Sequence, residues 1–216
     1  MAIPELLAGW QRFREGRFRD QQALFARLAT GQQPRIAMVA CCDSRVDPAI
    51  VFDCDPGELF IVRNVANLVP PREEGGSYHG TSAALEYAIG VLGVRHVVVL
   101  GHSQCGGIRA LLDGPPRGLP LRFTTAWMGI AQNARAAAML ATDLTPEARV
   151  ALCERLAISL SLQNLETFSG IRDRVARGEL YLHGLHVDLI DGVLTELDRA
   201  TDRFVPIGTK GGPGAP

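Results

Sequence analysis

The stretch HVVVLGHSQCGG, residues 96–107, decides the fold class of this 216-residue chain. Its first part, residues 96–100, is a continuous apolar and β-branched run, which is typical of a strand buried on both faces of a parallel sheet. The second part turns polar at once and carries a histidine, a cysteine and a pair of glycines. In open α/β sheets, ligands bind beyond the carboxyl ends of the strands. The stretch therefore predicts an α/β fold and the place of its chemistry.

The rest of the chain alternates between strand-like and helix-like segments. Apolar runs at 35–40 and 58–62 predict two more strands, and the alternation across 181–194 around Asp191-Gly192 indicates a hairpin. Helical patterns occupy 79–92, 106–112, 124–141 and the segment that opens at Thr145-Pro146. We predict an α/β fold whose mainly parallel central sheet has about four parallel strands plus an antiparallel edge strand and is flanked by helices.

No repeat and no linker divides the main body of the chain. We expect a single domain over residues 1–207 and a disordered tail over 208–216, where the sequence is GTKGGPGAP. Within that domain, residues 1–33 are expected to form a helical arm, because Leu6, Leu7, Trp10 and Phe13 recur at helical spacing. Since these apolar faces fit poorly into one compact core, we expect the arm to extend onto a partner subunit.

Composition and charge exclude several classes of protein. The formal net charge is −1, from 22 basic and 23 acidic residues, so we expect no binding to nucleic acid or to a membrane surface. The start of the chain lacks the pattern of a signal peptide, and no apolar run approaches the roughly 20 residues that span a bilayer. We expect a cytoplasmic protein. Its five scattered cysteines then suit packing, nucleophilic or metal-binding roles better than a disulfide framework.

Two polar clusters follow predicted strands. ACCDSR at 40–45 sets two cysteines beside an aspartate and an arginine, and GHSQCGG at 101–107 supplies His102 and Cys105. If the two strands are parallel neighbours, one cysteine of the first cluster joins His102 and Cys105 in a Cys₂His set. That set is typical of a catalytic zinc site, in which the fourth position stays open to solvent or substrate. The glycine pair at 106–107 would let the backbone approach closely.

With these residues in view, the chain resembles a β-class carbonic anhydrase. C-x-D-x-R at 41–45 and H-x-x-C at 102–105 carry the resemblance. It extends over PGELFIVRNVANLVPP (56–71), HGTSAALEYAIGVLGVRHVVVLGHSQCGG (79–107), SLQNLETF (161–168) and HGLHVDLIDG (183–192). The resemblance implies that Cys41, His102 and Cys105 bind one Zn²⁺ per chain. Cys42 then falls in the variable position of the motif, and we expect it to pack within the strand.

The same resemblance implies an enzyme that catalyses the reversible hydration of CO₂ to bicarbonate and a proton by a zinc-bound hydroxide. Asp43 and Arg45 match the catalytic dyad of the family, in which the carboxylate orients the nucleophile and the guanidinium keeps the carboxylate ionised. Asp43 is also the possible fourth zinc ligand of a closed state. Gly106 is expected to line the substrate pocket through its backbone. The family further implies a homodimer or homotetramer.

Two departures from the family pattern leave finer points open. Met38 stands where members with a regulatory bicarbonate site carry a tryptophan, although Arg63 matches the arginine of that site. Asp55 stands where the plant-like branch has a glutamine that contacts substrate. We therefore expect the metal shell to follow the family and doubt the bicarbonate regulation.

Other functions remain open at this point. The same scaffold could hydrolyse a CO₂ analogue, CS₂ or COS, because the metal shell does not decide between these substrates. A thiol redox or sensing protein would instead pair Cys41 with Cys42, although the adjacent aspartate disfavours a low thiolate pKa. An inactive zinc-binding homologue is the third alternative. His183 and His186, on the predicted hairpin, are candidates for a proton shuttle.

Overall fold

The computed structural model describes residues 1–75, 78–114 and 118–208. The chain divides into two compact units, the first over residues 1–33 and the second from Pro34 onward. Apart from Gly208, the tail that we predict to be disordered lies outside the described residues.

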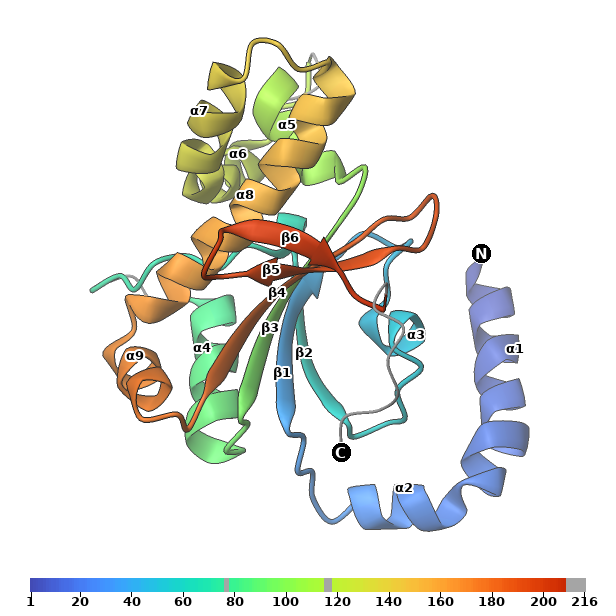
Figure 1. The fold of residues 1–216 in the computed structure, drawn as a ribbon. Helices are drawn as coiled ribbons and strands as arrows, with labels where there is room; N and C mark the ends of the chain where they lie inside the picture. Colours follow the sequence, from blue (N-terminus) through green and yellow to red (C-terminus); the bar gives the residue numbers. More distant parts are fainter. Residues whose placement is uncertain (76–77, 115–117, 209–216) are drawn as a thin grey trace. The chain divides into compact units, whose positions relative to one another are not determined.

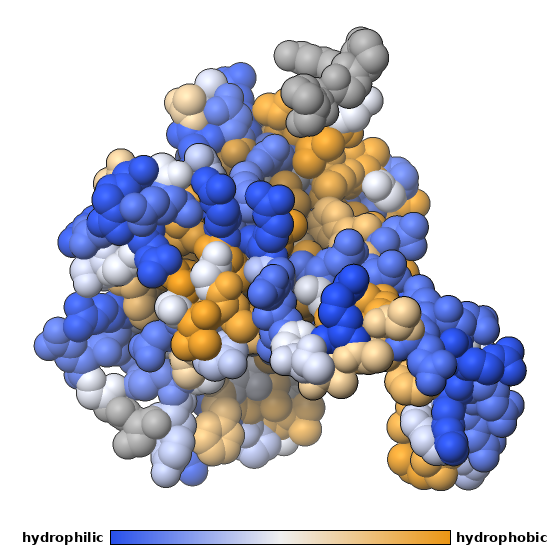
Figure 2. Space-filling view, turned by 90° about the horizontal axis from the view of Figure 1, so that it is seen from below, coloured by the Kyte–Doolittle hydropathy of each residue, from blue (hydrophilic) through white to orange (hydrophobic). Residues whose placement is uncertain are grey.

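The first unit is entirely helical. α1 (Ile3–Phe13) passes through a π-helical turn (Arg14–Phe18) and leads to α2 (Gln22–Leu28). The rings of three phenylalanines in this unit cluster, with centroids 4.9 to 5.9 Å apart. None of these helices buries a residue, and hydrophobic side chains lie open on their surface (Figure 2). Short helices draw most of their stability from packing, so this unit needs a covering surface.

The second unit is built on a six-stranded sheet in the order β2-β1-β3-β4-β5-β6 (Figure 1). The first four strands in this order are parallel to one another, whereas β5 pairs antiparallel with β4 on one side and with β6 on the other. The prediction of about four parallel strands is confirmed, but the antiparallel edge has two strands instead of one. The strands are β1 (Ile36–Cys41), β2 (Leu59–Asn64), β3 (His96–His102), β4 (Tyr181–Val187), β5 (Leu194–Asp198) and β6 (Arg203–Pro206).

The strand order reverses between β1 and β3. β2 lies on one side of β1, and the chain then crosses over to add β3 on the other side. Ligands in open α/β sheets bind at such a switch point, in the crevice beyond the carboxyl ends of the strands. Cys41 ends β1 and His102 ends β3, and the parallel register pairs Ala40 with Leu100 just before them. The fold therefore brings both motifs to the switch point.

Helices cover the sheet and its carboxyl end. α4 and α9 lie beside the sheet, while α5, α6 and α7 gather beyond the carboxyl ends of the strands, and α8 runs from that group along the sheet (Figure 1). The helices are α3 (Pro48–Val51), α4 (Gly80–Glu86), α5 (Gly106–Asp113), α6 (Arg122–Met128), α7 (Gln132–Leu140), α8 (Pro146–Glu166) and α9 (Ser169–Ala176).

The central strand is buried on both faces, as its sequence predicts. Val97 and Val99 enter one hydrophobic cluster, with residues of α4 and α9, and Val98 and Leu100 enter the other. The predicted cap of α8 is also confirmed, because the Thr145 hydroxyl accepts the N–H of Ala148. The predicted helix at 124–141 is instead broken into α6 and α7 by a 3₁₀ turn at Gly129–Ala131. Among the described residues, no helix has the length and apolar character needed to cross a membrane.

Candidate metal centre

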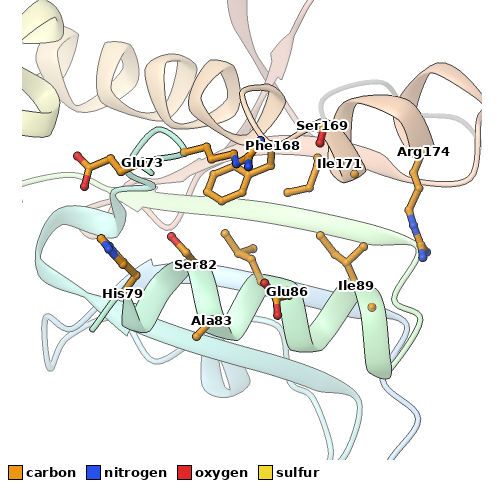
Figure 3. Close-up of a pocket in the computed structure, with 14 residues that line it drawn as sticks. Glu73, His79, Ser82, Ala83, Glu86, Ile89, Phe168, Ser169, Ile171 and Arg174 are labelled. Carbon is orange, nitrogen blue, oxygen red and sulfur yellow. The ribbon is translucent and has the colours of Figure 1, made fainter. Parts of the chain in front are cut away.

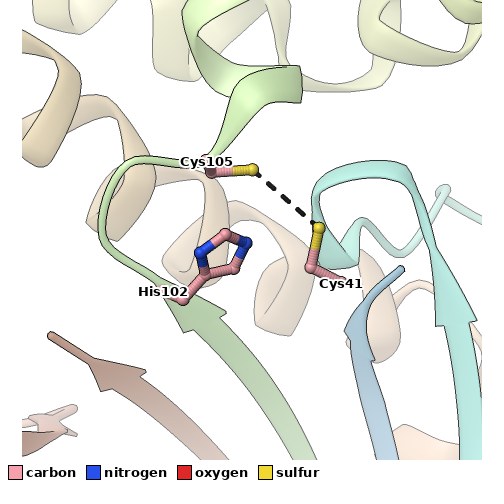
Figure 4. Close-up of side chains that lie close together, drawn as sticks. All are labelled: Cys41, His102 and Cys105. Atoms are coloured by element: carbon pink, nitrogen blue, oxygen red, sulfur yellow. Dashed lines mark hydrogen bonds between the residues drawn. The ribbon is translucent and has the colours of Figure 1, made fainter. Parts of the chain in front are cut away.

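Three side chains converge at the switch point, each from a different element. Cys41 is the last residue of β1, His102 is the last residue of β3, and Cys105 precedes the first residue of α5. All three are at least 96% buried. Figure 4 shows the two sulfur atoms and the imidazole ring facing one another. Sequence positions more than 60 residues apart thus meet because β1 and β3 are neighbours.

The spacing of these three groups suits a metal ion. The sulfur atoms of Cys41 and Cys105 are 4.0 Å apart, and the three ligand atoms all lie within 4.8 Å of one another. Two thiolates bound tetrahedrally to zinc at about 2.3 Å would be about 3.8 Å apart. The set is also the only cluster of three or more potential metal ligands among the described residues.

His102 is held in the orientation that a metal ligand needs. Its Nδ1 lies 2.9 Å from the carbonyl oxygen of Ser103, so this nitrogen donates and Nε2 keeps its lone pair. Nε2 is buried and has no hydrogen-bond partner among the described residues. Because an unpaired buried polar atom is costly, this nitrogen points to a ligand at the site. The residues present therefore fit a zinc ion.

The two buried cysteines form a coupled acid pair. The hydrogen bond with Cys105 lowers the pKa of Cys41 well below its usual value, against the opposing effect of burial. The same contact, together with burial, raises the pKa of Cys105. Burial alone would lower the pKa of His102, but the neighbouring Cys41 sulfur raises it overall. Deprotonation of Cys41 is therefore favoured here even without a bound cation. Deprotonation of Cys105 as well is favoured only when a cation is bound.

Asp43 and Arg45 form a bidentate ion pair at the mouth of the site. Nε and Nη2 of Arg45 donate to the two carboxylate oxygens at 2.9 and 2.7 Å. This pairing holds the pKa of Asp43 well below its usual range. Oδ2 of Asp43 lies 4.0 Å from Nε2 of His102. A carboxylate that is ionised at neutral pH thus stands beside the candidate ligands.

Backbone turns build this arrangement, and strand alternation does not. β1 ends at Cys41, and the N–H of Arg45 bonds back to Oδ1 of Asp43 at 3.0 Å, which closes an Asx turn. Strand geometry therefore does not continue through Arg45. Cys42 is exposed, so the expectation that it packs within the strand is wrong. Its N–H still bonds to the carbonyl of Asn64, but its side chain leaves the sheet where the chain turns.

Two further contacts lock the loops together. Nη2 of Arg45 also donates to the carbonyl oxygen of Gln104 at 2.9 Å, which joins the first motif to the second. Gln104 presents that carbonyl from a left-handed conformation, with φ at 59°. Arg63 on β2 organises the first loop by donating to the carbonyl oxygens of Cys41, Asp43 and Val46 and to the carboxylate of Asp47, at 2.7 to 3.1 Å.

The two adjacent glycines, Gly106 and Gly107, differ in the space around them. A Cβ added at Gly107 would lie 2.9 Å from Cγ1 of Val65 and 3.1 Å from Cβ of Ala66. A Cβ at Gly106 would meet nothing within 4 Å. Gly107 therefore lets the start of α5 approach Val65 and Ala66 closely, whereas Gly106 faces open space.

A cavity of about 560 Å³ lies elsewhere, between α4 and α9. His79, Ser82 and Glu86 line one of its walls, and Phe168 and Arg174 line the other (Figure 3). None of the candidate metal ligands lines it. Its size alone does not make it the catalytic site.

The candidate shuttle histidines lie away from the mouth of the site. His183 contacts His96 at the amino end of β3, six residues and about 20 Å of strand from His102. His186 is buried, and its Nε2 lies 3.2 Å from the carboxylate of Glu154. Glu154 in turn accepts the N–H of Cys105. Sequence reasoning missed Glu154, because no local pattern links it to a loop 49 residues earlier.

Known proteins resemble this chain in sequence and in fold. A family model described as carbonic anhydrase matches residues 36–194. Beta carbonic anhydrase 3 of Arabidopsis thaliana is 36% identical over 205 residues, which covers 93% of this chain and 79% of that protein. The likeness therefore includes both motifs and the whole parallel sheet.

Solved structures extend the comparison to three dimensions. The structure of the beta-carbonic anhydrase CcaA matches with a TM-score of 0.89 and 34% identity, covering 94% of this chain and 91% of that one. One of two tetrameric beta-carbonic anhydrases from Sordaria macrospora matches with a TM-score of 0.80 and 28% identity, covering 91% and 96%. Sequence and fold thus point to the same set of proteins.

Proposed function

The chain belongs to the β-class carbonic anhydrase family, and from this premise we propose that Cys41, His102 and Cys105 hold one catalytic zinc ion per chain. The enzyme catalyses the reversible hydration of CO₂ to bicarbonate and a proton. One observation carries the assignment of the ligands. Two buried sulfur atoms and the unpartnered Nε2 of His102 converge within 4.8 Å.

Zinc, when bound, lowers the pKa of a coordinated water toward neutrality and so makes a nucleophile available for attack on CO₂. The protein side of the proposal is the ligand shell. The Ser103 carbonyl fixes the imidazole tautomer of His102, and two cysteine thiolates balance the charge of the cation. Neither cysteine then needs to leave its buried position during turnover.

Asp43 is proposed to orient the reacting water. Its pKa is held well below the usual range, so the carboxylate stays ionised and can only accept hydrogen bonds. The Asp43 carboxylate would accept a hydrogen bond from the water. A lone pair of the water oxygen would then be free to face the carbon of CO₂. Preorganised contacts of this kind act without reorganisation during the reaction.

Arg45 is proposed to hold Asp43 in this role. The bidentate contact leaves the carboxylate little freedom to rotate, and the additional bond to Gln104 ties the pair to the H-x-x-C loop. Loss of this clasp would free Asp43 to become the fourth zinc ligand of a closed state. Gly106, which faces open space, is proposed to line the substrate pocket through its backbone.

The helical arm, residues 1–33, is proposed to pack on a partner subunit in a homodimer or homotetramer. The structure from Sordaria macrospora is that of a tetrameric enzyme. In this chain, residues 1–33 bury no side chain within their helices, while Leu6, Leu7 and Trp10 are each more than half exposed. Packing of α1 on a partner subunit would cover them. Light scattering on Leu6→Glu and Trp10→Glu variants, expected to dissociate, tests this part of the proposal.

Zinc analysis together with CO₂ kinetics tests the proposed site. We expect one zinc per chain in the wild type, loss of zinc in Cys105→Ser, and retained zinc with a strong loss of CO₂ hydration in Asp43→Ala. Near-normal hydration by Asp43→Ala would refute the orienting role. Metal-free protein with titratable thiols would favour the redox alternative. Assays with CS₂ and COS on the same preparation test whether the scaffold also accepts those analogues. The cytoplasmic location stays a prediction.

A further inference from the structure

A buried carboxylate that the proposed mechanism does not use stands behind the ligand loop. Glu154 on α8 is 3% exposed, and its Oε1 accepts the backbone N–H of Cys105 at 2.9 Å. Hydrogen bonds between a carboxylate and a backbone N–H are among the stronger ones in proteins. This bond fixes the main chain at the point where Cys105 leaves the loop and α5 begins.

The packing of α8 explains how the carboxylate reaches this loop. A Cβ at Gly101 would lie 2.6 Å from Cδ1 of Ile158, and a Cβ at Gly184 would lie 2.8 Å from Cγ2 of the same residue. These two glycines therefore let α8 approach β3 and β4 closely. Glu154 precedes Ile158 by four residues, so both side chains project from the same face of the helix. The close approach at Ile158 thus carries Glu154 to Cys105.

His186 holds the other oxygen of this carboxylate. Its Nε2 lies 3.2 Å from Oε2 of Glu154, and both side chains are 2% exposed. His186 belongs to β4, and Thr195 on β5 donates its hydroxyl to the carbonyl oxygen of His186. With one oxygen on each partner, the carboxylate has a single orientation. Removing either partner would leave a buried polar group unpaired.

We propose that Glu154 and His186 are positioning residues for the metal ligand Cys105. Glu154 sets the main chain of Cys105 so that its sulfur faces Cys41, and His186 sets the orientation of Glu154. Neither residue touches the reacting atoms, so both act through the ligand. The inference rests on the proposed zinc site, because it assigns a role in holding that ion.

The rate of zinc release tests this role without using catalysis. We compare the wild type, Glu154→Ala, Glu154→Gln and Ser161→Ala by transfer of zinc to a chromophoric chelator. Ser161 is the matched control: it is a fully buried polar residue of α8 whose hydroxyl accepts a backbone N–H, that of Val69. Loss of contacts to a metal ligand typically costs 10- to 100-fold in metal affinity. We expect zinc release from Glu154→Ala to be about 10- to 100-fold faster, as that principle implies.

The conservative variant separates positioning from a general loss of stability. Glu154→Gln keeps an oxygen acceptor for Cys105, so we expect its release rate to stay within about threefold of the wild type, against the larger change for Ala. Ser161→Ala should release zinc at the wild-type rate even if its melting temperature falls. The visible spectrum of the cobalt(II)-substituted proteins gives a second readout, because thiolate-to-cobalt bands should change in Glu154→Ala alone.

Two other outcomes would contradict the positioning role of Glu154. Wild-type release and an unchanged cobalt spectrum in Glu154→Ala would overturn the positioning role while leaving the zinc site intact. A wild type that binds no zinc would overturn the proposed site and this inference together. Should Glu154→Ala fail to fold, His186→Asn and His186→Phe repeat the comparison with the Glu154 carboxylate still present beside Cys105. The donor-keeping Asn should release zinc more slowly than Phe, and equal rates would overturn the role of His186.

Discussion

The guanidinium of Arg45 grips the carboxylate of Asp43 through two hydrogen bonds, Nε to Oδ1 at 2.9 Å and Nη2 to Oδ2 at 2.7 Å. The side chain of Asp43 is 18% exposed and that of Arg45 is 53% exposed, so this pair is open to solvent while Oδ2 of Asp43 lies 4.0 Å from Nε2 of the buried His102. An exposed ion pair by itself contributes little to stability. Its value lies in the orientation of Asp43, and that gives a first prediction.

Arg45→Ala should lower CO₂ hydration by roughly 10- to 100-fold, because a misplaced catalytic group can cost that much. Without the clasp, the pKa of Asp43 moves back toward its usual value and the carboxylate is free to turn to the metal. Stopped-flow hydration assays and a crystal structure of the zinc-loaded variant provide the check. Arg109→Ala is the matched control, because Arg109 donates to the side-chain oxygen of Gln104 but has no hydrogen bond or ion pair with Asp43 among the residues that the structure describes. An open site with normal rates would contradict the prediction.

The sequence predicted the four parallel strands and the three side chains that converge at their carboxyl ends, but it did not predict the turn that follows β1. Periodicity identifies residues 96–100 as a doubly buried strand, and motif spacing identifies His102 and Cys105. Strand geometry ends at Cys41, because an Asx turn at Asp43 follows it. Asp and Ser favour such turns, so residue chemistry at 43–44 was the signal that should have limited the strand.

Two features, the edge strand β6 and the long-range bond between Glu154 and Cys105, could not be predicted from the sequence for physical reasons. β6 is four residues long, is mostly exposed and ends in a proline, so it carries little hydrophobic pattern. The bond between Glu154 and Cys105 depends on how closely α8 packs on the sheet, and Gly101 and Gly184 decide that distance. Neither glycine looks special in its local sequence. Contacts of this kind become visible only when the elements are packed.

Zinc binding should release protons. Without metal, the pKa of Cys41 lies well below its usual value and that of Cys105 lies above it, so near neutral pH the pair holds about one proton. Zinc needs both thiolates and a neutral His102, whose pKa is raised. We expect about one to two protons per zinc at pH 7 and an affinity that rises with pH. Calorimetry in buffers of different ionisation enthalpy measures this number, and a release near zero would refute the coupled pair.

The two adjacent glycines should respond differently to a methyl group. Gly107→Ala forces Cβ to within 2.9 Å of Val65, and overpacking of this kind costs about 1–3 kcal/mol of unfolding free energy. Gly106→Ala meets nothing within 4 Å and should leave the stability nearly unchanged. If Gly106 lines the substrate pocket, the same variant should lower CO₂ turnover with zinc still bound. Denaturant unfolding and hydration assays on both variants separate packing from access, and equal losses of stability would contradict the assignment.

A histidine pair at the amino end of β3 should make the fold sensitive to acid. Nδ1 of His96 lies 3.1 Å from Nε2 of His183, whose Nδ1 lies 3.1 Å from the carboxylate of Glu196. Burial lowers the pKa of His96, and the positive charges of His183, Arg35 and Arg95 lower it further. The contact between Nδ1 of His96 and Nε2 of His183 has room for only one proton, so it also opposes full protonation of His96.

The sign of the effect follows from linkage. Because the pKa of His96 is lower in the folded state than in the unfolded chain, the unfolded chain binds more protons once the pH falls below about 6.5. The free energy of unfolding must therefore decrease as the pH falls from about 6.5 through the folded-state pKa of His96.

His96→Gln removes this contribution, so its melting temperature should fall less than that of the wild type between pH 7.5 and 5. Loss of zinc at low pH affects both proteins alike and cancels in the difference. His79→Gln, at an exposed histidine that contacts the Gly75 carbonyl, should follow the wild type. Identical slopes for His96→Gln and the wild type would show that the pair does not carry the effect.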